Sequence, residues 1–289
     1  MPNIWTHILF ADELAEKSGV DVTNYEKFFH LGAQGPDPFF YYNFWPWSKD
    51  KSVTRLGSLL HKEKCGVFFR ELLMTVKSSE HDPILKYYAL GFIAHHILDR
   101  NAHPYIIHKS GEEKNQHQVL ETTIDTLLAK EQGILTWKTP VYQRIYVGKN
   151  LPSQIIELHV HLMEQVYSLT DDVAVKVNKS YRDMIRALKV LYDPTGLKNK
   201  LLGQMISPFS HNQNYLPNVD YLNIKKTKWF HPVDNSEESN ESFYEILDRA
   251  KEEGVKTLQA ALAFYDGYAD IEEVAELLGN NSYETGRPC

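Results

Sequence analysis

The sequence predicts an all-α protein built as a bundle of several helices. Apolar residues recur at helical spacing in several segments of the chain. No segment shows a convincing alternation of apolar and polar residues, which is the pattern expected of half-buried strands. We also find no internal repeat and no low-complexity tract, and the composition is ordinary for a globular protein.

The expected helices are separated by segments rich in residues that disfavour helix interiors. Asp193-Pro194-Thr195-Gly196 is such a break, and residues 206–240, rich in Pro, Asn, Ser and His, look like a long irregular connection. In chain order we expect helices near residues 8–15, 67–74, 91–105, 117–125, 153–169, 172–192, from 241 onward, and 271–278.

A first series of histidine and carboxylate residues, His95, Asp99 and His103, has members four residues apart. Such residues lie on one face of a helix, and imidazole with carboxylate is the ligand chemistry of zinc and similar divalent metals. The series spans about 12 Å at about 1.5 Å per residue, whereas metal–ligand bonds are only about 2 Å long. One ion therefore cannot reach both ends, but two neighbouring ions bridged by Asp99 can.

A second series repeats this spacing with His117, Glu121 and Asp125. For a single series, the simpler interpretation is a helix whose acids and histidines only bond one another. Two series in one stretch of chain favour a metal site, because unpaired charge among apolar neighbours is costly. Pro104 has no backbone N–H, so we expect the first helix to kink or stop near it. If that helix breaks early, His108 could take the place of His103.

In their order along the chain, these residues resemble the zinc-dependent phospholipase C family, which shares its fold with the secreted single-strand zinc nucleases. The resemblance is strong over residues 1–125 and weak beyond them. It implies a phospholipase C/nuclease-type bundle with a metal cluster in a cleft. The further segments that agree with the family pattern are Thr6-His7, the Gly-Pro-Asp loop at 32–37, the segment 57–61 that ends in His61, and Asn115-Gln116-His117.

The resemblance implies a role for each matching residue. One zinc ion would have four ligands, Asp37, His61, His95 and Asp99. A second would have three, His103, His117 and Glu121. His7 would join Asp99 at a third ion, and Asp37 would also face the attacking water and act as base. The simpler alternatives are that Asp37 only caps a turn, since Gly-Pro-Asp-Pro is strong turn chemistry, and that His61 is an ordinary helix residue.

The N-terminal segment departs from the family pattern. Secreted members expose a tryptophan whose amine and carbonyl bind the third zinc, but here Trp5 is internal. A Met1 or Pro2 amine could substitute. We see no charged segment followed by an apolar stretch and a cleavage site, and only two cysteines, Cys65 and Cys289. We therefore expect a cytoplasmic protein with an uncleaved N-terminus, two zinc ions, and a third position in doubt.

These observations predict a zinc-dependent hydrolase, a phosphodiesterase of phospholipase C type that cleaves a small phosphodiester or phospholipid with zinc-activated water. A nuclease with the same site is one alternative, and a non-catalytic helical protein braced by zinc is another. The net charge of −7 argues against binding to duplex nucleic acid, and no apolar run is long enough to cross a bilayer. We expect residues 1–200 to form the catalytic domain and residues 201–289 a helical extension packed on it.

Overall fold

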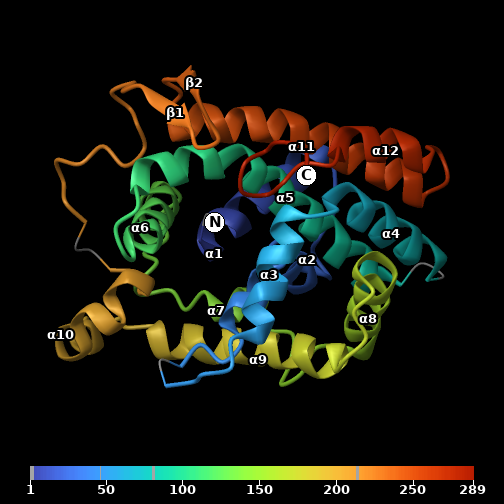
Figure 1. Ribbon diagram of the computed structural model, residues 1–289, viewed down its shortest axis with the longest axis horizontal. Coiled ribbons are helices and arrows are strands. Elements are labelled where there is room, and N and C mark those ends of the chain that lie inside the picture. The colour runs from blue at the N-terminus through green and yellow to red at the C-terminus, as the bar shows by residue number, and fades with distance from the viewer. Residues whose placement is uncertain (1–2, 46, 80–81, 213–214) are drawn as a thin grey trace.

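The computed structural model describes residues 3–45, 47–79, 82–212 and 215–289, and they form a predominantly helical protein (Figure 1). The all-α prediction is confirmed. In chain order the α-helices are α1 (Ile4–Ser18), α2 (Glu26–Gly32), α3 (Ser52–Lys62), α4 (Cys65–Ser78), α5 (Pro83–Ser110), α6 (Gln116–Glu131), α7 (Tyr142–Ile145), α8 (Ser153–Tyr167), α9 (Val173–Leu191), α10 (Leu197–Leu202), α11 (Phe243–Tyr265) and α12 (Ile271–Leu278). Short 3-10 turns are η1 (Asp37–Tyr41), η2 (Gly203–Met205) and η3 (Ser207–Phe209).

The long helix α5 is the centre of the fold. It buries 20 of its 28 residues, as expected for a helix that is apolar on all sides. Its start is well defined, because the Asp82 side chain accepts hydrogen bonds from the backbone N–H groups of Ile84 and Leu85, and Pro83 occupies the first helical position. Helices α1, α2, α4, α6, α8 and α11 all pack against it.

Pro104 does not end this helix. Helix α5 continues through Pro104 to Ser110, so the expectation of a stop is wrong, and His108 does not replace His103. Proline cannot donate to the carbonyl four residues earlier, which here belongs to Arg100. Gly286 covers that carbonyl, and a Cβ atom at this position would lie only 2.5 Å from the Arg100 oxygen. Tertiary packing thus accommodates a residue that would break an isolated helix.

Two glycines let α2 approach α5 at backbone distance. A Cβ atom on Gly32 would lie 2.0 Å from the carbonyl oxygen of Tyr88, and one on Gly91 would lie 2.1 Å from that of Phe29. Neither position can carry a side chain without moving the helices apart. This close contact fixes the loop that follows α2, which leads directly into η1 and Asp37.

The segment between α9 and α11 contains a small hairpin. Strands β1 (Trp229–His231) and β2 (Asp234–Ser239) pair antiparallel with an irregularity after Phe230. The expectation of an entirely irregular connection without strands is therefore wrong for residues 229–239. Five of the six β2 residues are exposed, and the alternation in β1 covers only three residues, which is too short for a sequence prediction.

The division into residues 1–200 and 201–289 stays a prediction. Helix α11 packs along α1 and α5, and α12 packs on α4 and α11, so the C-terminal helices cover the same central helix as the N-terminal ones (Figure 1). No helix within the described residues is both long and apolar enough to cross a membrane.

Candidate metal centre

The eight residues proposed as metal ligands lie together in the fold. They come from five elements: His7 from α1, Asp37 from η1, His61 from α3, three residues from α5, and two from α6. They form three groups, in each of which one ligand atom per residue lies within 4.8 Å of the others. The groups are His7/His95/Asp99, Asp37/His61/His95 and His103/His117/Glu121.

The first two groups share His95 and meet at Asp99. The Nε2 atom of His95 lies 3.1 Å from Asp99 Oδ2 and 3.9 Å from Asp37 Oδ1. The Nε2 atom of His61 lies 3.3 Å from Asp37 Oδ1 and 3.9 Å from Asp99 Oδ2. Two imidazole nitrogens and two carboxylates thus converge on one point, the four-residue set that the sequence resemblance implied.

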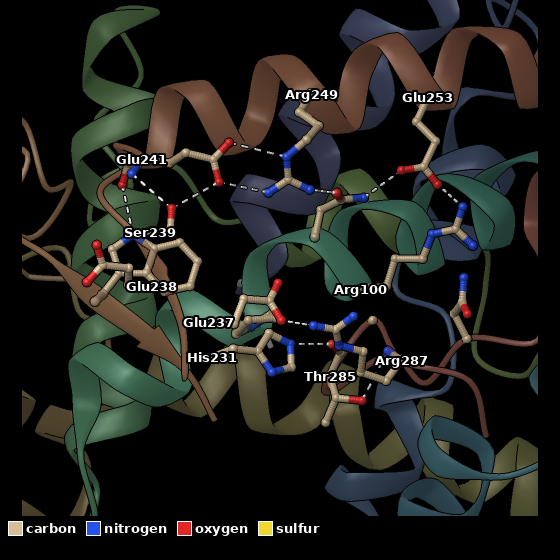
Figure 2. Close-up of a pocket in the computed structure, with 15 residues that line it drawn as sticks. Arg100, His231, Glu237, Glu238, Ser239, Glu241, Arg249, Glu253, Thr285 and Arg287 are labelled. Atoms are coloured by element: carbon tan, nitrogen blue, oxygen red, sulfur yellow. Dashed lines mark hydrogen bonds and ion pairs between the residues drawn. The ribbon is translucent and has the colours of Figure 1, made fainter. Parts of the chain in front are cut away.

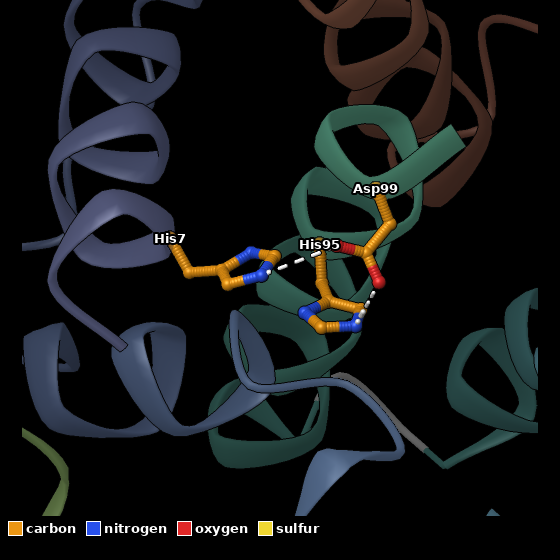
Figure 3. Close-up of side chains that lie close together, drawn as sticks. All are labelled: His7, His95 and Asp99. Carbon is orange, nitrogen blue, oxygen red and sulfur yellow. Dashed lines mark ion pairs between the residues drawn. The ribbon is translucent and has the colours of Figure 1, made fainter. Parts of the chain in front are cut away.

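The two oxygens of Asp99 face different histidines, as Figure 3 shows. Asp99 Oδ1 lies 3.3 Å from Nε2 of His7, while Oδ2 faces His95. The rings of His7 and His95 are stacked with centroids 4.2 Å apart. Asp99 is completely buried, and this position between two histidine groups is the one that a bridging carboxylate needs.

Backbone carbonyls orient three of the histidines. His61 Nδ1 donates to the carbonyl of Gly57 at 2.7 Å, and His95 Nδ1 donates to that of Ala33 at 3.0 Å. His103 Nδ1 donates to the carbonyl of Tyr283 at 2.8 Å. With Nδ1 protonated, a neutral ring has its lone pair on Nε2, the atom that faces the carboxylates in His61 and His95. Metal-binding histidines are commonly held this way.

The third group lies at the other end of the α5 series. His117 Nε2 is 2.6 Å from Glu121 Oε1, and the ring centroids of His117 and His103 are 6.0 Å apart. The side chain of His117 retains 31% of its exposure, whereas that of His103 is buried. This group therefore has one side toward solvent.

The charges in the cluster suit a cation. Burial lowers the pKa of His103 well below its usual range, and burial together with the neighbouring His95 lowers that of His7. Burial also acts to lower the pKa of His95, but the charges of Asp99 and Asp37 outweigh it and raise the value. The pKa of Asp99 stays well below its usual range despite burial, because of His95 and His103. The pKa shifts of His7, His103 and Asp99 favour neutral imidazoles beside an ionised carboxylate, the protonation states that bind metals.

Several buried polar atoms of the cluster have no hydrogen-bond partner within the described part of the chain. Buried unsatisfied atoms are rare in native proteins, and a bound ion is one of the arrangements that satisfies them. Here they gather around one point, so the donor set fits a divalent metal bound by nitrogen and oxygen. The atoms are both ring nitrogens of His7, Nε2 of His95, Oδ1 of Asp37 and both oxygens of Asp99.

Asp125, the last member of the second sequence series, has a different role. Its carboxylate accepts hydrogen bonds from the backbone N–H groups of Trp5 and Thr6 at 3.0 and 2.8 Å, and from His211 Nε2 at 2.8 Å. A carboxylate at a helix N-terminus satisfies free N–H groups and the helix dipole. Asp125 shares the spacing of the second series but is not among the eight proposed ligands, and it holds α1, the helix of His7.

The backbone nitrogen of Trp5 is the one bonded to Asp125, so it does not reach toward a metal. The suggested substitutes, Met1 and Pro2, lie outside the described residues. His7 and Asp99 nonetheless lie together at the position predicted for a third ion.

Sequence reasoning missed the segment after α12, residues 279–289, which we call the tail. Tyr283 is buried, and its ring lies with its centroid 5.0 Å from that of His61 and 4.4 Å from that of His96. Its backbone N–H donates to the carbonyl of His61, and its carbonyl accepts from His103. The tail therefore orients the His103 ring and fixes the backbone at His61, so it contacts two of the candidate groups. These contacts join residues some 180–220 positions apart. No local sequence pattern predicts contacts over such a separation.

The other side of the tail closes a charged cavity of about 510 Å³ between α5, α11 and the hairpin, shown in Figure 2. His231 of β1 donates from Nε2 to the carbonyl of Thr285 at 2.9 Å, and Arg287 pairs with Glu237 of β2. Arg100 pairs with Glu253 across the same cavity. None of the eight candidate ligands lines this space. The Arg287–Glu237 pair ties the tail to the hairpin, and the Arg100–Glu253 pair ties α5 to α11.

The sequence model of the zinc-dependent phospholipase C family matches residues 6–188, well over half of the 289-residue chain, and the protein therefore belongs to this family. The matched range contains all eight candidate ligands and ends before the tail. Comparison with curated proteins and with solved structures found no significant match to either. Family membership supports a metal-dependent function of phospholipase type.

Proposed function

We propose that the protein is a phosphodiesterase of phospholipase C type, which uses zinc to hydrolyse the phosphodiester bond of a phospholipid or a similar small molecule. The observation that carries this proposal is Asp99, a fully buried carboxylate whose two oxygens face different histidines and have no hydrogen-bond partner among the described residues. A buried charge is costly unless it is paired or bound to a metal, and the histidines facing the two oxygens of Asp99 are groups that also bind metals.

The residues proposed to hold zinc are the three groups described above. Asp37, His61, His95 and Asp99 would hold one ion, and His103, His117 and Glu121 a second, with His7 and Asp99 offering a third position. Bound zinc would lower the pKa of a water molecule toward about 7 and would neutralise charge on phosphate oxygens. The residues of the chain fix the ions, exclude bulk water and move the proton.

Asp37 is proposed as the residue that faces the attacking water. Its side chain keeps 12% of its exposure, whereas that of Asp99 keeps none. It also lies on a short turn at the edge of the cluster rather than on the central helix. Asp37 would orient the water and accept its proton while the water oxygen forms the new bond to phosphorus and the alkoxide leaves from the opposite side.

The structure offers support for an active site over a purely structural zinc site. Structural zinc is normally closed by four protein ligands, while catalytic zinc has three and an open position. The third group offers three ligand atoms among the described residues, and its His117 is partly exposed. Family membership favours a phospholipid over a nucleic acid substrate, and the net charge of −7 agrees with this.

The test of this proposal is Asp37→Asn. The exchange preserves side-chain size and removes the proton-accepting charge, so we expect the zinc-loaded variant to lose hydrolysis by about 10²–10⁴-fold while the third group keeps its metal. The assay compares nitrophenyl phosphocholine and phosphatidylcholine with a phosphomonoester and single-stranded DNA. Asp21→Asn, an exposed loop carboxylate, is the matched control and should retain full activity.

Two results would contradict the proposal. A wild-type protein that binds zinc but cleaves no phosphodiester would favour the structural role. Preferential cleavage of DNA would favour the nuclease. Full activity of Asp37→Asn would leave the activity standing and remove Asp37 as the base.

A further inference from the structure

The short helix α10 and the turns after it have an unusual surface. Leu197, Leu201, Leu202, Met205 and Phe209 each keep between 41% and 74% of their exposure. We call these five residues the α10 face. Among the described residues, helix α10 itself buries none of its side chains, and Figure 1 shows it at one edge of the molecule.

Exposed apolar residues are concentrated in the part of the chain that contains this face. The described chain has 17 strongly exposed large apolar residues, and eight of them fall between Leu197 and Ile224. Single exposed leucines are common on soluble proteins, but clusters of this kind usually mark a surface that binds a membrane or another protein.

The local charge distinguishes between these partners. Residues 186–209 include four basic residues and one acidic residue, Asp193, in a chain with a net charge of −7. Asp193 is buried and accepts hydrogen bonds from Asn199. Arg186 pairs with Asp183 and Lys198 donates to backbone carbonyls, while Lys200 is exposed. The segment that carries the α10 face is thus basic in an otherwise acidic chain. Apolar side chains interspersed with lysines are the signature of segments that lie in the headgroup region of anionic membranes.

The α10 face also adjoins the walls of the metal centre. Turn η3 packs on α6, the helix of His117 and Glu121. Phe209 lines a small cavity together with Asn3, which caps the helix of His7, and Tyr41, which ends the turn that begins at Asp37. A membrane in contact with this face would therefore lie beside the elements that carry the candidate ligands.

We propose that the α10 face is a membrane-docking surface that places the protein on a bilayer containing anionic phospholipids. As an account of how substrate is reached, this proposal rests on the phospholipase function proposed above. The apolar side chains would enter the interfacial region, and the exposed Lys200 would face the headgroups. Docking requires no covalent step, so it can be measured separately from hydrolysis.

The test is co-sedimentation of the zinc-loaded full chain with vesicles of equimolar phosphatidylcholine and phosphatidylglycerol. Leu201→Ser/Met205→Ser removes two exposed side chains, and we expect at least about a tenfold loss of vesicle binding from the apolar area lost. Val67→Ser/Met74→Ser removes two comparably exposed residues from α4, at 54% and 47% exposure, and should bind like wild type. Lys200→Glu should weaken binding to these vesicles more than to pure phosphatidylcholine, and added salt should weaken wild-type binding.

Hydrolysis of soluble nitrophenyl phosphocholine separates this proposal from the proposed function. The Leu201→Ser/Met205→Ser variant should keep its rate on that substrate and lose rate on vesicles. Vesicle binding without any hydrolysis would support docking and overturn the phospholipase function. The docking proposal is overturned if wild type stays in the supernatant, or if both double variants lose binding equally. It is also overturned if Leu201→Ser/Met205→Ser changes only the oligomeric state, because the face would then join two copies of the chain.

Discussion

Asp99 contacts more candidate ligands than any other carboxylate of the cluster, with His7 on one oxygen and His61 and His95 near the other. His103 Nδ1 is a further 3.9 Å neighbour. Removing a charge that several metal sites share should lower the metal affinity of all of them. Removing a peripheral ligand should lower the affinity of one site. The two kinds of residue can therefore be told apart by metal stoichiometry.

We expect wild-type protein purified without chelators to contain at least two zinc ions per chain. Asp99→Asn should weaken binding at more than one site, because the shared negative charge is lost, and His117→Ala should empty mainly the third group. Elemental analysis after dialysis measures both. Equal losses in the two variants, or no loss in either, would show that Asp99 is not a bridge.

Gly35 affects the site without being a ligand. It has a φ of +49°, and a Cβ atom there would lie 2.2 Å from Cδ2 of His95. A side chain at this position is strained by about 1–2 kcal/mol and must also push the His95 ring away. Because Gly35 lies against the His95 ring, a change in the loop conformation would move this candidate ligand.

We expect Gly35→Ala to lower zinc affinity by about 10–100-fold, the usual effect of disturbing a residue that orients a ligand, with all eight candidate ligands intact. Gly133→Ala is the matched control, because Gly133 has a φ of +74° and a Cβ atom added there would meet no other atom within 4 Å. Competition with a zinc-binding dye gives both affinities. An unchanged zinc affinity in Gly35→Ala would mean that the loop can shift without displacing the His95 ring.

At the scale of elements, the tail acts as a brace between α3 and α5. Its Tyr283 carbonyl accepts from His103 on α5, while its N–H and the Ser282 hydroxyl donate to the carbonyl of His61 on α3. The family match ends at residue 188, so this brace comes from outside the matched region. Ion pairs with the hairpin hold it in turn.

We expect Tyr283→Ala to cost about 3–5 kcal/mol of stability, as for other large buried aromatic residues, and also to weaken zinc binding. Tyr265→Ala is the control, since Tyr265 is buried in α11 away from the cluster and should lose stability alone. Denaturant unfolding and zinc titration are compared at a temperature where both variants are folded. Equal zinc affinity in the two variants would mean that the tail contributes to packing and not to metal binding.

For the whole molecule, the cluster joins α1, η1, α3, α5 and α6 around buried polar atoms. Without cations, these elements enclose ionised carboxylates and imidazole lone pairs that lack partners, which is costly. Metal binding should therefore contribute to folding as well as to chemistry.

We expect chelation to lower the unfolding temperature substantially, and zinc to restore it. A ligand that binds only the folded state at about a thousand times its Kd adds roughly 4 kcal/mol per site. Calorimetry with and without chelator measures the change, and calcium, which prefers all-oxygen ligands, should not restore it. An unfolding temperature independent of metal would contradict a metal-linked fold.

Sequence patterns alone predicted the helical class and the local geometry of the ligand series. His95, Asp99 and His103 share a face because helix periodicity alone fixes their spacing, and the order of motifs brought Asp37 and His61 into the same prediction. Spacing alone could not assign the role of Asp125. A carboxylate occupies the same position in the helical repeat whether it faces a metal or, as here, the N-terminus of α1.

Which distant segments meet depends on tertiary packing, and no local pattern predicted it. Helix α5 passes through Pro104 because Gly286 covers the freed carbonyl region, and Tyr283 reaches His61 and His103 from the far end of the chain. Such contacts depend on how the faces of different helices pack together. They produce no periodic pattern of residues that could be recognised in the sequence. Local backbone geometry therefore specified the ligand series, while long-range packing specified which side chains complete and brace the centre.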